Sequence, residues 1–174
     1  MTPAVTFREQ EPGDTGFLQR LFAAGLESSL GLHAWPERER AFVVGMQYEA
    51  RERDWAQRCP PGRLEIIEVD GAPAGRLRLS RPDTDGTRRV IDLAIAPEHR
   101  QRGLATRALT RCTGPLSLNV ARTNLPAQRL YTRLGFRPRG GDELDLFLHR
   151  QADWRSITHD VATTAPLRNQ RGGP

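Results

Sequence analysis

The chain has 174 residues, of which 37% are hydrophobic and 27% charged, and this composition is typical of a globular protein rather than a disordered or fibrous one. Its formal net charge of +5, carried by arginine with no lysine, suits an anionic cofactor as well as nucleic acid. The cysteines form no C-x-x-C pair and the histidines show no H-E-x-x-H spacing, so no metal site or disulfide framework is expected. No secretion signal or membrane-spanning run is visible, which predicts a cytoplasmic protein without a membrane partner.

The N-terminal third is predicted to hold one strand and two helices. A short strand is expected at residues 4–7, and Asp14 is expected to cap a helix that Gly25 loosens or ends. The apolar face of that helix is Phe17, Leu18, Leu21 and Phe22. The second helix should run from Pro36 to about Gln57. Its core face is expected to comprise Phe42, Val43, Met46 and Ala50.

The middle of the chain predicts an antiparallel meander followed by a crossover. Strands are expected at residues 64–69 and 74–79 around an Asp70-Gly71 turn, and then at Val90–Ile95, which is apolar enough to be buried on both faces. A short helix from about Gly103 to Thr113 leads to a strand at residues 116–120. Because strand, helix and strand form a right-handed crossover, this last strand should run parallel to the central one and the sheet is mixed.

The C-terminal part predicts a helix, a hairpin and a tail. Pro126 suits the first turn of a helix that Gly135 ends, and its inward residues are Ala127, Leu130, Tyr131 and Leu134. A hairpin is expected at residues 136–139 and 144–148. We therefore predict one domain at residues 1–150 and an extension at 151–174, anchored by Trp154 and partly disordered.

The loop after the Val90–Ile95 strand is a candidate anion site. A strand, a tight loop and a helix start together point backbone N–H groups and the positive end of the helix dipole at one place. Gly103 allows close approach there, and the arginines at 100, 102, 107 and 111 gather around it. The loop matches neither the P-loop nor the dinucleotide-binding pattern.

Two stretches carry a resemblance to a known family. The loop Arg100-Gln101-Arg102-Gly103-Leu104-Ala105 resembles the R/Q-x-x-G-x-G/A motif of the GCN5-related N-acetyltransferases (GNAT), which cradles the pyrophosphate of coenzyme A. Residues 118–136 are similar to the family pattern L-x-V-x-x-x-N-x-x-A-x-x-L-Y-x-x-L-G-F. The positions that match it include Asn124, Ala127, Leu130, Tyr131, Leu134, Gly135 and Phe136. The resemblance covers roughly residues 4–149.

The resemblance implies a fold and a set of site residues. The fold is an α/β (α+β) single domain, with a mostly antiparallel mixed sheet of about seven strands, helices on both faces, and a splay between the fourth and fifth strands. Acetyl-CoA is then the cosubstrate, bound along the central strand and the following loop. The implied cofactor residues are Leu93, Ala94, Ile95, Arg100, Gln101, Arg102, Gly103, Leu104, Ala105, Asn124 and Tyr131.

The same resemblance assigns catalytic roles for acetyl transfer to an amine. The backbone N–H of Leu93 would stabilise the developing oxyanion, and Tyr131 would be the general acid for the leaving thiolate. The alternative for Tyr131 is packing beside Ala127 and Leu134. Some family members carry a Glu base where this chain has Asn119. Asp92 could serve instead, directly or through water, or it could be a structural partner of an arginine; the base could also be water alone.

The acceptor and the partners are less closely defined. Trp35 and Tyr48 are candidates for substrate contact, with ordinary packing as the alternative for each. The acceptor is expected to be a small-molecule or peptide amine, and the short central helix leaves a flank for contact with a second subunit in a homodimer. One rival hypothesis is a non-catalytic acyl-CoA-binding module. A nucleic-acid-binding protein is the least favoured, because no basic stripe with interleaved aromatics is present.

Overall fold

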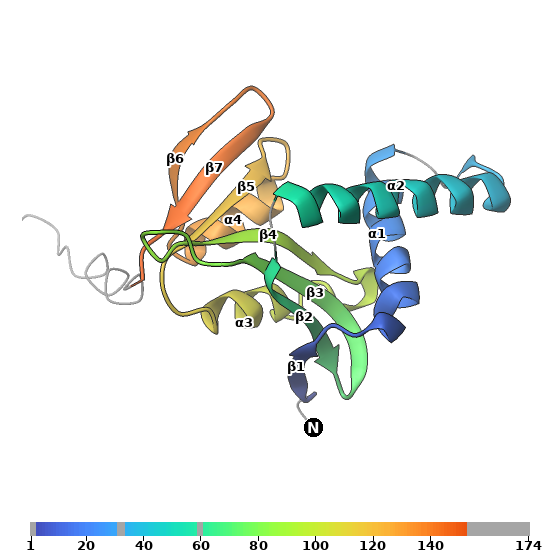
Figure 1. Ribbon diagram of the computed structural model, residues 1–174, viewed down its shortest axis with the longest axis horizontal. Helices are drawn as coiled ribbons and strands as arrows, with labels where there is room; N and C mark the ends of the chain where they lie inside the picture. Colours follow the sequence, from blue (N-terminus) through green and yellow to red (C-terminus); the bar gives the residue numbers. More distant parts are fainter. Residues whose placement is uncertain (1–2, 31–33, 59–60, 153–174) are drawn as a thin grey trace, which may run out of the picture.

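The computed structural model describes residues 3–30, 34–58 and 61–152, so Trp154 and the predicted extension from residue 153 onward lie outside the described residues. A seven-stranded sheet carries helices on both faces (Figure 1). The elements, in chain order, are β1 (Val5–Glu9), η1 (Pro12–Asp14), α1 (Thr15–Leu30), α2 (Glu37–Arg58), β2 (Pro61–Val69), β3 (Ala72–Ser80), β4 (Arg88–Ile95), η3 (Pro97–His99), α3 (Leu104–Thr110), β5 (Leu116–Ala121), α4 (Leu125–Arg133), β6 (Arg137–Gly141) and β7 (Asp145–Arg150). This order of strands and helices is the one the sequence predicts.

The sheet is mixed, with strand order β1-β2-β3-β4-β5-β7-β6. Strands β1 to β4 form an antiparallel meander, and β4 with β5 is the parallel pair. The turn between β2 and β3 has Asp70 at φ 51° and Gly71 at φ 79°, and two consecutive positive φ values fit the twist of a two-residue hairpin. The predicted hairpin and crossover are both confirmed.

The parallel pair β4–β5 separates soon after it begins. Its partners are Arg88 with Leu116 and Arg89 with Ser117. Strand β4 then continues along β3 as far as Ile95, whereas β5 continues along β7. The predicted splay between the fourth and fifth strands is therefore confirmed, and it leaves one edge of β4 without a strand partner.

A β-bulge in β4 changes which side chains share a face. Leu79 of β3 lies opposite Val90, and the next residue, Arg78, lies opposite Asp92, so Ile91 is the extra residue. Val90 consequently belongs to the same core cluster as Leu93, on the face opposite Asp92. Unbroken alternation predicts that Val90 shares the face of Asp92. That prediction is wrong, because a bulge shifts the alternation by one residue.

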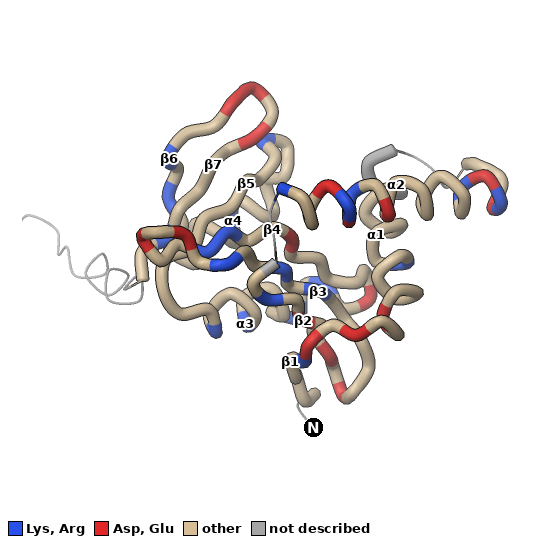
Figure 2. Tube along the Cα trace, in the orientation of Figure 1, with Lys and Arg blue, Asp and Glu red and all other residues tan. Residues whose placement is uncertain are grey.

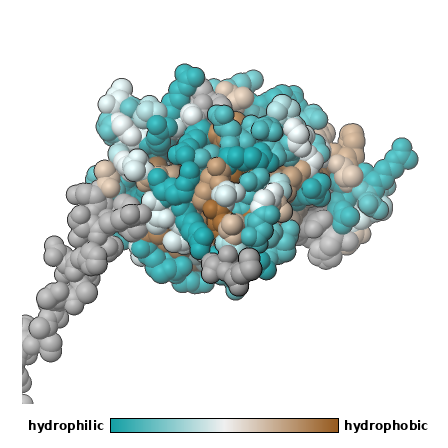
Figure 3. Space-filling model, turned by 90° about the horizontal axis from the view of Figure 1, so that it is seen from below, coloured by the Kyte–Doolittle hydropathy of each residue, from teal (hydrophilic) through white to brown (hydrophobic). Residues whose placement is uncertain are grey.

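Two hydrophobic clusters fill the two faces of the sheet. The larger one packs α3 and α4 on the sheet and includes Ile67, Leu77, Leu79, Val90, Leu104, Ala108, Leu109, Leu116, Leu118 and Phe136. The smaller one lies under α1 and α2 and consists of Leu18, Leu21, Tyr48, Ile66 and Ala96. Seen from below, most of the surface is hydrophilic and apolar residues show mainly near its middle (Figure 3). No helix in the described parts of the chain is both long and apolar enough to cross a bilayer.

The start of the first helix differs from expectation. Asp14 lies in η1, where its carboxylate accepts a hydrogen bond from the N–H of Glu11 at 2.8 Å and pairs with Arg8 at 2.7 Å. These contacts hold the pKa of Asp14 below its ordinary value, with the hydrogen bond from Arg8 as the largest cause. Helix α1 continues through Gly25 to Leu30, so this glycine does not end it.

The buried face of α2 is not the predicted one. Phe42 and Met46 are 70% and 53% exposed, whereas Val44 and Tyr48 are buried. Acidic and basic residues lie toward both ends of this helix, with an uncharged stretch between them (Figure 2). Glu52 there pairs with the buried Arg76 of β3 at 2.9 Å. Counting apolar residues alone misses a helix face that packs through ion pairs.

Candidate active site

The splay turns backbone groups of β4 toward an open edge. The N–H of Ala96 donates to the carbonyl of Ala74 at 2.9 Å, so the even-numbered residues at this end of β4 hydrogen-bond to β3. Alternation then turns the N–H groups of Leu93 and Ile95 away from β3, to the side that β5 has left. Leu93, Ala94 and Ile95 are only half-buried. Of the strand predicted to be buried on both faces, only Val90 is fully buried, because β4 lines this gap.

The loop between η3 and α3 lies beside the same end of β4. Gln101 and Gly103 have φ values of 60° and 75°, and Gly103 stands at the N-cap of α3. A Cβ on Gly103 would meet no heavy atom within 4 Å, so the positive φ rather than crowding by the protein favours glycine. Gln101 and Arg102 are exposed, whereas Leu104 is buried and fixes the start of the helix.

A hydrogen bond from Arg100 links this loop to β4. The Nε of this arginine donates to the carbonyl oxygen of Ile95 at 3.1 Å. That carbonyl points to the open side of β4, as the Ile95 N–H does. The structure thus brings the predicted phosphate loop and the predicted thioester strand together at one end of the gap.

Asn124 and Tyr131 come from α4. The Asn124 side chain accepts a hydrogen bond from the N–H of Ala127 at 3.2 Å and so caps the helix. The ring of Tyr131 packs edge-on against Phe136, with centroids 5.5 Å apart. Burial raises the pKa of Tyr131 to about 12, and the negative charge of Asp92 adds to the rise. The Tyr131 hydroxyl therefore stays protonated well above neutral pH.

Asp92 belongs to a network of charged side chains that sequence reasoning did not find. Its Oδ2 accepts hydrogen bonds from Arg76 Nη2 at 2.7 Å and Nε at 2.8 Å, which makes Arg76 the arginine partner considered for it. Glu52 of α2 accepts from Arg76 and, at 2.7 Å, from Arg78. Burial opposes ionisation of Glu52, but the two arginines hold its pKa below the ordinary value. The available signal was the alternation Arg76-Leu77-Arg78-Leu79 in a strand with one apolar face.

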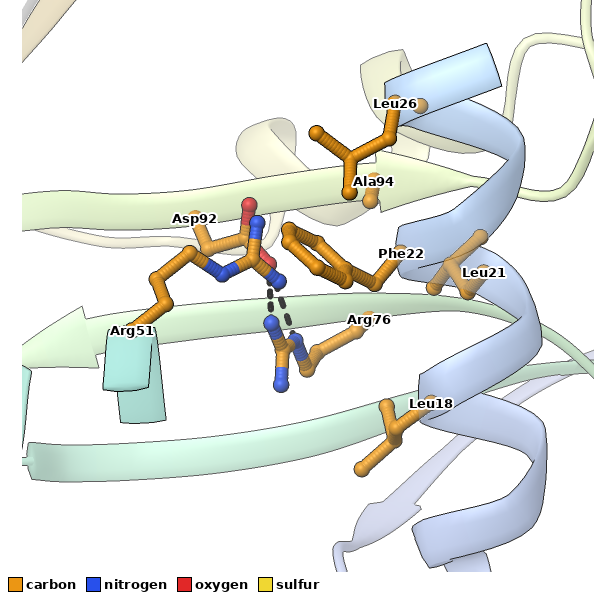
Figure 4. Close-up of a pocket in the computed structure, with 9 residues that line it drawn as sticks. Leu18, Leu21, Phe22, Leu26, Arg51, Arg76, Asp92 and Ala94 are labelled. Atoms are coloured by element: carbon orange, nitrogen blue, oxygen red, sulfur yellow. Dashed lines mark hydrogen bonds and ion pairs between the residues drawn. The ribbon is translucent and has the colours of Figure 1, made fainter. Parts of the chain in front are cut away.

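A cavity of about 260 Å³ adjoins this network between α1, α2 and β4 (Figure 4). Its lining consists of Leu18, Leu21, Phe22, Gly25, Leu26, Arg51, Arg76, Asp92 and Ala94. Tyr48 is instead buried in the smaller core cluster, 5.9 Å from the ring of Phe22, and Trp35 is 48% exposed before α2. Neither aromatic lines this cavity, and a substrate role for them stays a prediction.

Comparisons with known proteins fit this geometry. A sequence model of the acetyltransferase (GNAT) family matches residues 29–136, whereas no curated protein sequence matches. The PaiA N-acetyltransferase of Thermoplasma acidophilum, in complex with coenzyme A, has a TM-score of 0.63 at 14% identity over 85% of this chain and 99% of that one. An acetyltransferase from Thermus thermophilus gives 0.58 at 24% identity, over 85% and 97%. The yncA protein of Salmonella typhimurium, with its cofactor acetyl-CoA, gives 0.55 at 20% identity, over 86% and 95%.

These structural likenesses, all under 25% identity, show a shared fold. The family match is independent of them and spans more than half of the chain, including both the loop after β4 and helix α4. The chain belongs to the acetyltransferase (GNAT) family.

Proposed function

We propose that this protein transfers an acetyl group from acetyl-CoA to a primary amine by direct attack in a ternary complex, through a domain formed by residues 1–150. The observation that carries the proposal is the separation of β4 from β5 beside the family loop, with two backbone N–H groups turned to the open side. Two proteins of the same fold, PaiA and yncA, were crystallised with coenzyme A and acetyl-CoA, which supports this choice of cosubstrate.

The residues around the gap fit a bound acetyl-CoA. The loop from Arg100 to Ala105 would hold its pyrophosphate, since residues with positive φ, here Gln101 and Gly103, are typical of backbone turns whose N–H groups bind anions. The N–H of Ile95 would bind the pantetheine arm, and Asn124 would contact the arm from α4. Unpaired backbone donors at a strand edge need such a partner or water.

The catalytic groups follow from the same placement. Acetyl-CoA supplies a thioester whose carbonyl oxygen gains negative charge during attack, and the N–H of Leu93 is placed to stabilise that charge. The C–N bond to the amine forms and the C–S bond of the thioester breaks, and the Tyr131 hydroxyl would donate a hydrogen bond to the leaving thiolate. With a pKa of about 12, compared with about 8.5 for a free thiol, this tyrosine acts best as a persistent hydrogen-bond donor.

Asp92 is the acidic residue that we propose binds the acceptor amine or accepts its proton. Both hydrogen bonds that the described residues make to its carboxylate go to Oδ2. Its Oδ1 is therefore available to bind the amine or take its proton, directly or through water. Arg76 fixes the orientation of this carboxylate at the cavity wall.

Thiol release from acetyl-CoA in the presence of a panel of amines tests the proposal. We expect release that depends on both the protein and an amine, together with an acetylated amine in the mass spectrum. The exposed Asn119, at the position where some family members carry a glutamate base, favours the alternative of a non-catalytic acyl-CoA-binding module. Binding of acetyl-CoA in calorimetry with no release for any amine would establish that alternative and overturn the transfer.

A further inference from the structure

Arg51 is the surplus cation in a half-buried charged cluster. The cluster joins three arginines (Arg51, Arg76 and Arg78) to two acids, Glu52 and Asp92, which leaves one excess positive charge. Asp92 pairs with Arg76, and Glu52 pairs with both Arg76 and Arg78. Within residues 3–30, 34–58 and 61–152, no carboxylate forms an ion pair with Arg51, and its Nε is buried without a hydrogen-bond partner.

The Arg51 guanidinium is nevertheless held in a defined place. It lies over the rings of Phe22, at 4.0 Å from the centroid, and of Trp55, at 4.3 Å. Burial is the largest cause that lowers the pKa of Arg51, so the site disfavours its charge. The charges of Asp92 and Glu52 oppose this effect, but neither carboxylate forms an ion pair with Arg51, so its guanidinium can bind a ligand carboxylate through charge-assisted hydrogen bonds.

The cavity that Arg51 faces has two kinds of wall. Leucines of α1, with Phe22 and Ala94, form an apolar side, and Arg51 approaches Asp92 on the other (Figure 4). Asp92 provides a negative group beside the positive one, so a ligand with an amine next to a carboxylate matches both. A volume of about 260 Å³ is small for a ligand pocket, which excludes large acceptors from full enclosure.

We propose, building on the acetyl transfer inferred above, that the acceptor is a small apolar α-amino acid. Arg51 binds its carboxylate, Asp92 receives its amine, and the apolar wall of α1 holds its side chain. Arg51 is then the residue that selects an amino acid over an amine without a carboxylate.

The experiment compares L-leucine with isoamylamine, which is the same molecule without the carboxylate, as acceptors for the full chain. We expect kcat/KM to be about 10- to 100-fold higher for L-leucine, the usual value of charge-assisted hydrogen bonds. In Arg51→Gln this preference should disappear, because kcat/KM falls for L-leucine and stays unchanged for isoamylamine. Arg53→Gln, which changes an exposed arginine of the same helix, should keep it. Arg51→Gln also loses the contacts of the guanidinium with the Phe22 and Trp55 rings, so thermal unfolding of both variants checks that each is folded at the assay temperature.

The outcomes separate this inference from the proposed function. Equal kcat/KM for the two acceptors in the wild type, or an unchanged preference in Arg51→Gln, would overturn carboxylate recognition and leave acetyl transfer standing. If no amine is acetylated, calorimetry measures whether L-leucine binds. Binding to the wild type that is lost in Arg51→Gln would support the carboxylate site and overturn only the acetyl transfer. If L-leucine neither binds nor is acetylated, the carboxylate site and the proposed acetyl transfer are both overturned.

Discussion

The hydroxyl of Tyr131, the proposed general acid, lies in a buried environment. The chain has two tyrosines, and burial raises the pKa of both, to about 12 for Tyr131. We therefore predict that the folded protein shows little tyrosinate absorbance at pH 10, where an ordinary tyrosine is half ionised. Because the pKa is higher in the folded than in the unfolded state, the protonated hydroxyl contributes to the free energy of unfolding. This contribution is fully present below pH 10 and is lost as the pH rises toward 12. Half-maximal tyrosinate absorbance at pH 10 in native protein would contradict this environment.

Removing that hydroxyl tests the catalytic role of Tyr131. The variant Tyr131→Phe should lower kcat by about 100-fold, the lower range for general acid catalysis, because the leaving sulfur loses its donor. The affinity for acetyl-CoA and the thermal unfolding midpoint should change little, since the ring keeps its contact with Phe136. Stopped assays of thiol release give kcat. An unchanged kcat would leave Tyr131 with a packing role only.

At the level of single residues, the sequence predicted the positions of the motif residues in their helices better than the contacts that hold the charged side chains. Motif spacing placed Gly103 and Tyr131 correctly relative to their helices, because both positions depend on local backbone geometry. The pairing of Asp92 with Arg76 and the placement of Arg51 over the ring of Phe22 depend on contacts between segments far apart in the chain. No local pattern of charges determines which of many arginines a carboxylate will meet.

Among the elements, β3 and β4 must keep close contact for β4 to offer its other edge to a ligand. Gly75 of β3 lies opposite Ile95, and a Cβ there would come within 2.6 Å of the Ala94 carbonyl oxygen and 2.8 Å of Ile95 Cδ1. We predict that Gly75→Ala lowers the free energy of unfolding by about 1–3 kcal/mol and weakens acetyl-CoA binding, because β4 must shift.

A matched glycine in α2 provides the control for that variant. Gly45 lies inside the helix, and a Cβ there would meet nothing within 4 Å. Gly45→Ala should therefore raise the free energy of unfolding by up to about 1 kcal/mol, since alanine favours helix. Urea unfolding measures both variants. Equal stability of the two proteins would show that the close approach of β3 and β4 at Gly75 is not a constraint.

The elements themselves were largely predictable, and their faces were not. Turn residues such as Asp70-Gly71 and the helix-starting Pro126 marked the element boundaries through local backbone preferences. The bulge at Ile91 and the charged inner face of α2 were missed, because both depend on what the neighbouring strand presents. Because the charged inner face of α2 was missed, Phe42 was expected in the core, whereas it is exposed.

In the whole molecule, the gap between β4 and β5 and the cavity both lie against β4. The Leu93 and Ile95 amides serve the open edge of β4, and Asp92 and Ala94 present their side chains to the cavity under α1 and α2. Alternation along a strand, reset by the bulge at Ile91, produces this division. In the proposed reaction, a thioester bound at the open edge and an amine bound in the cavity would thus meet at β4.

Amide hydrogen exchange along β4, with and without acetyl-CoA, tests this arrangement most directly. The Ala94 N–H lies on the β3 side and should be protected in both states, whereas those of Leu93 and Ile95 should exchange fast alone and slow strongly on addition of acetyl-CoA. Leu93 and Ile95 are thus the probes, and Ala94 between them is the control. If Leu93 and Ile95 exchange as slowly as Ala94 without acetyl-CoA, or do not slow when it is added, the gap beside β4 is not its binding site.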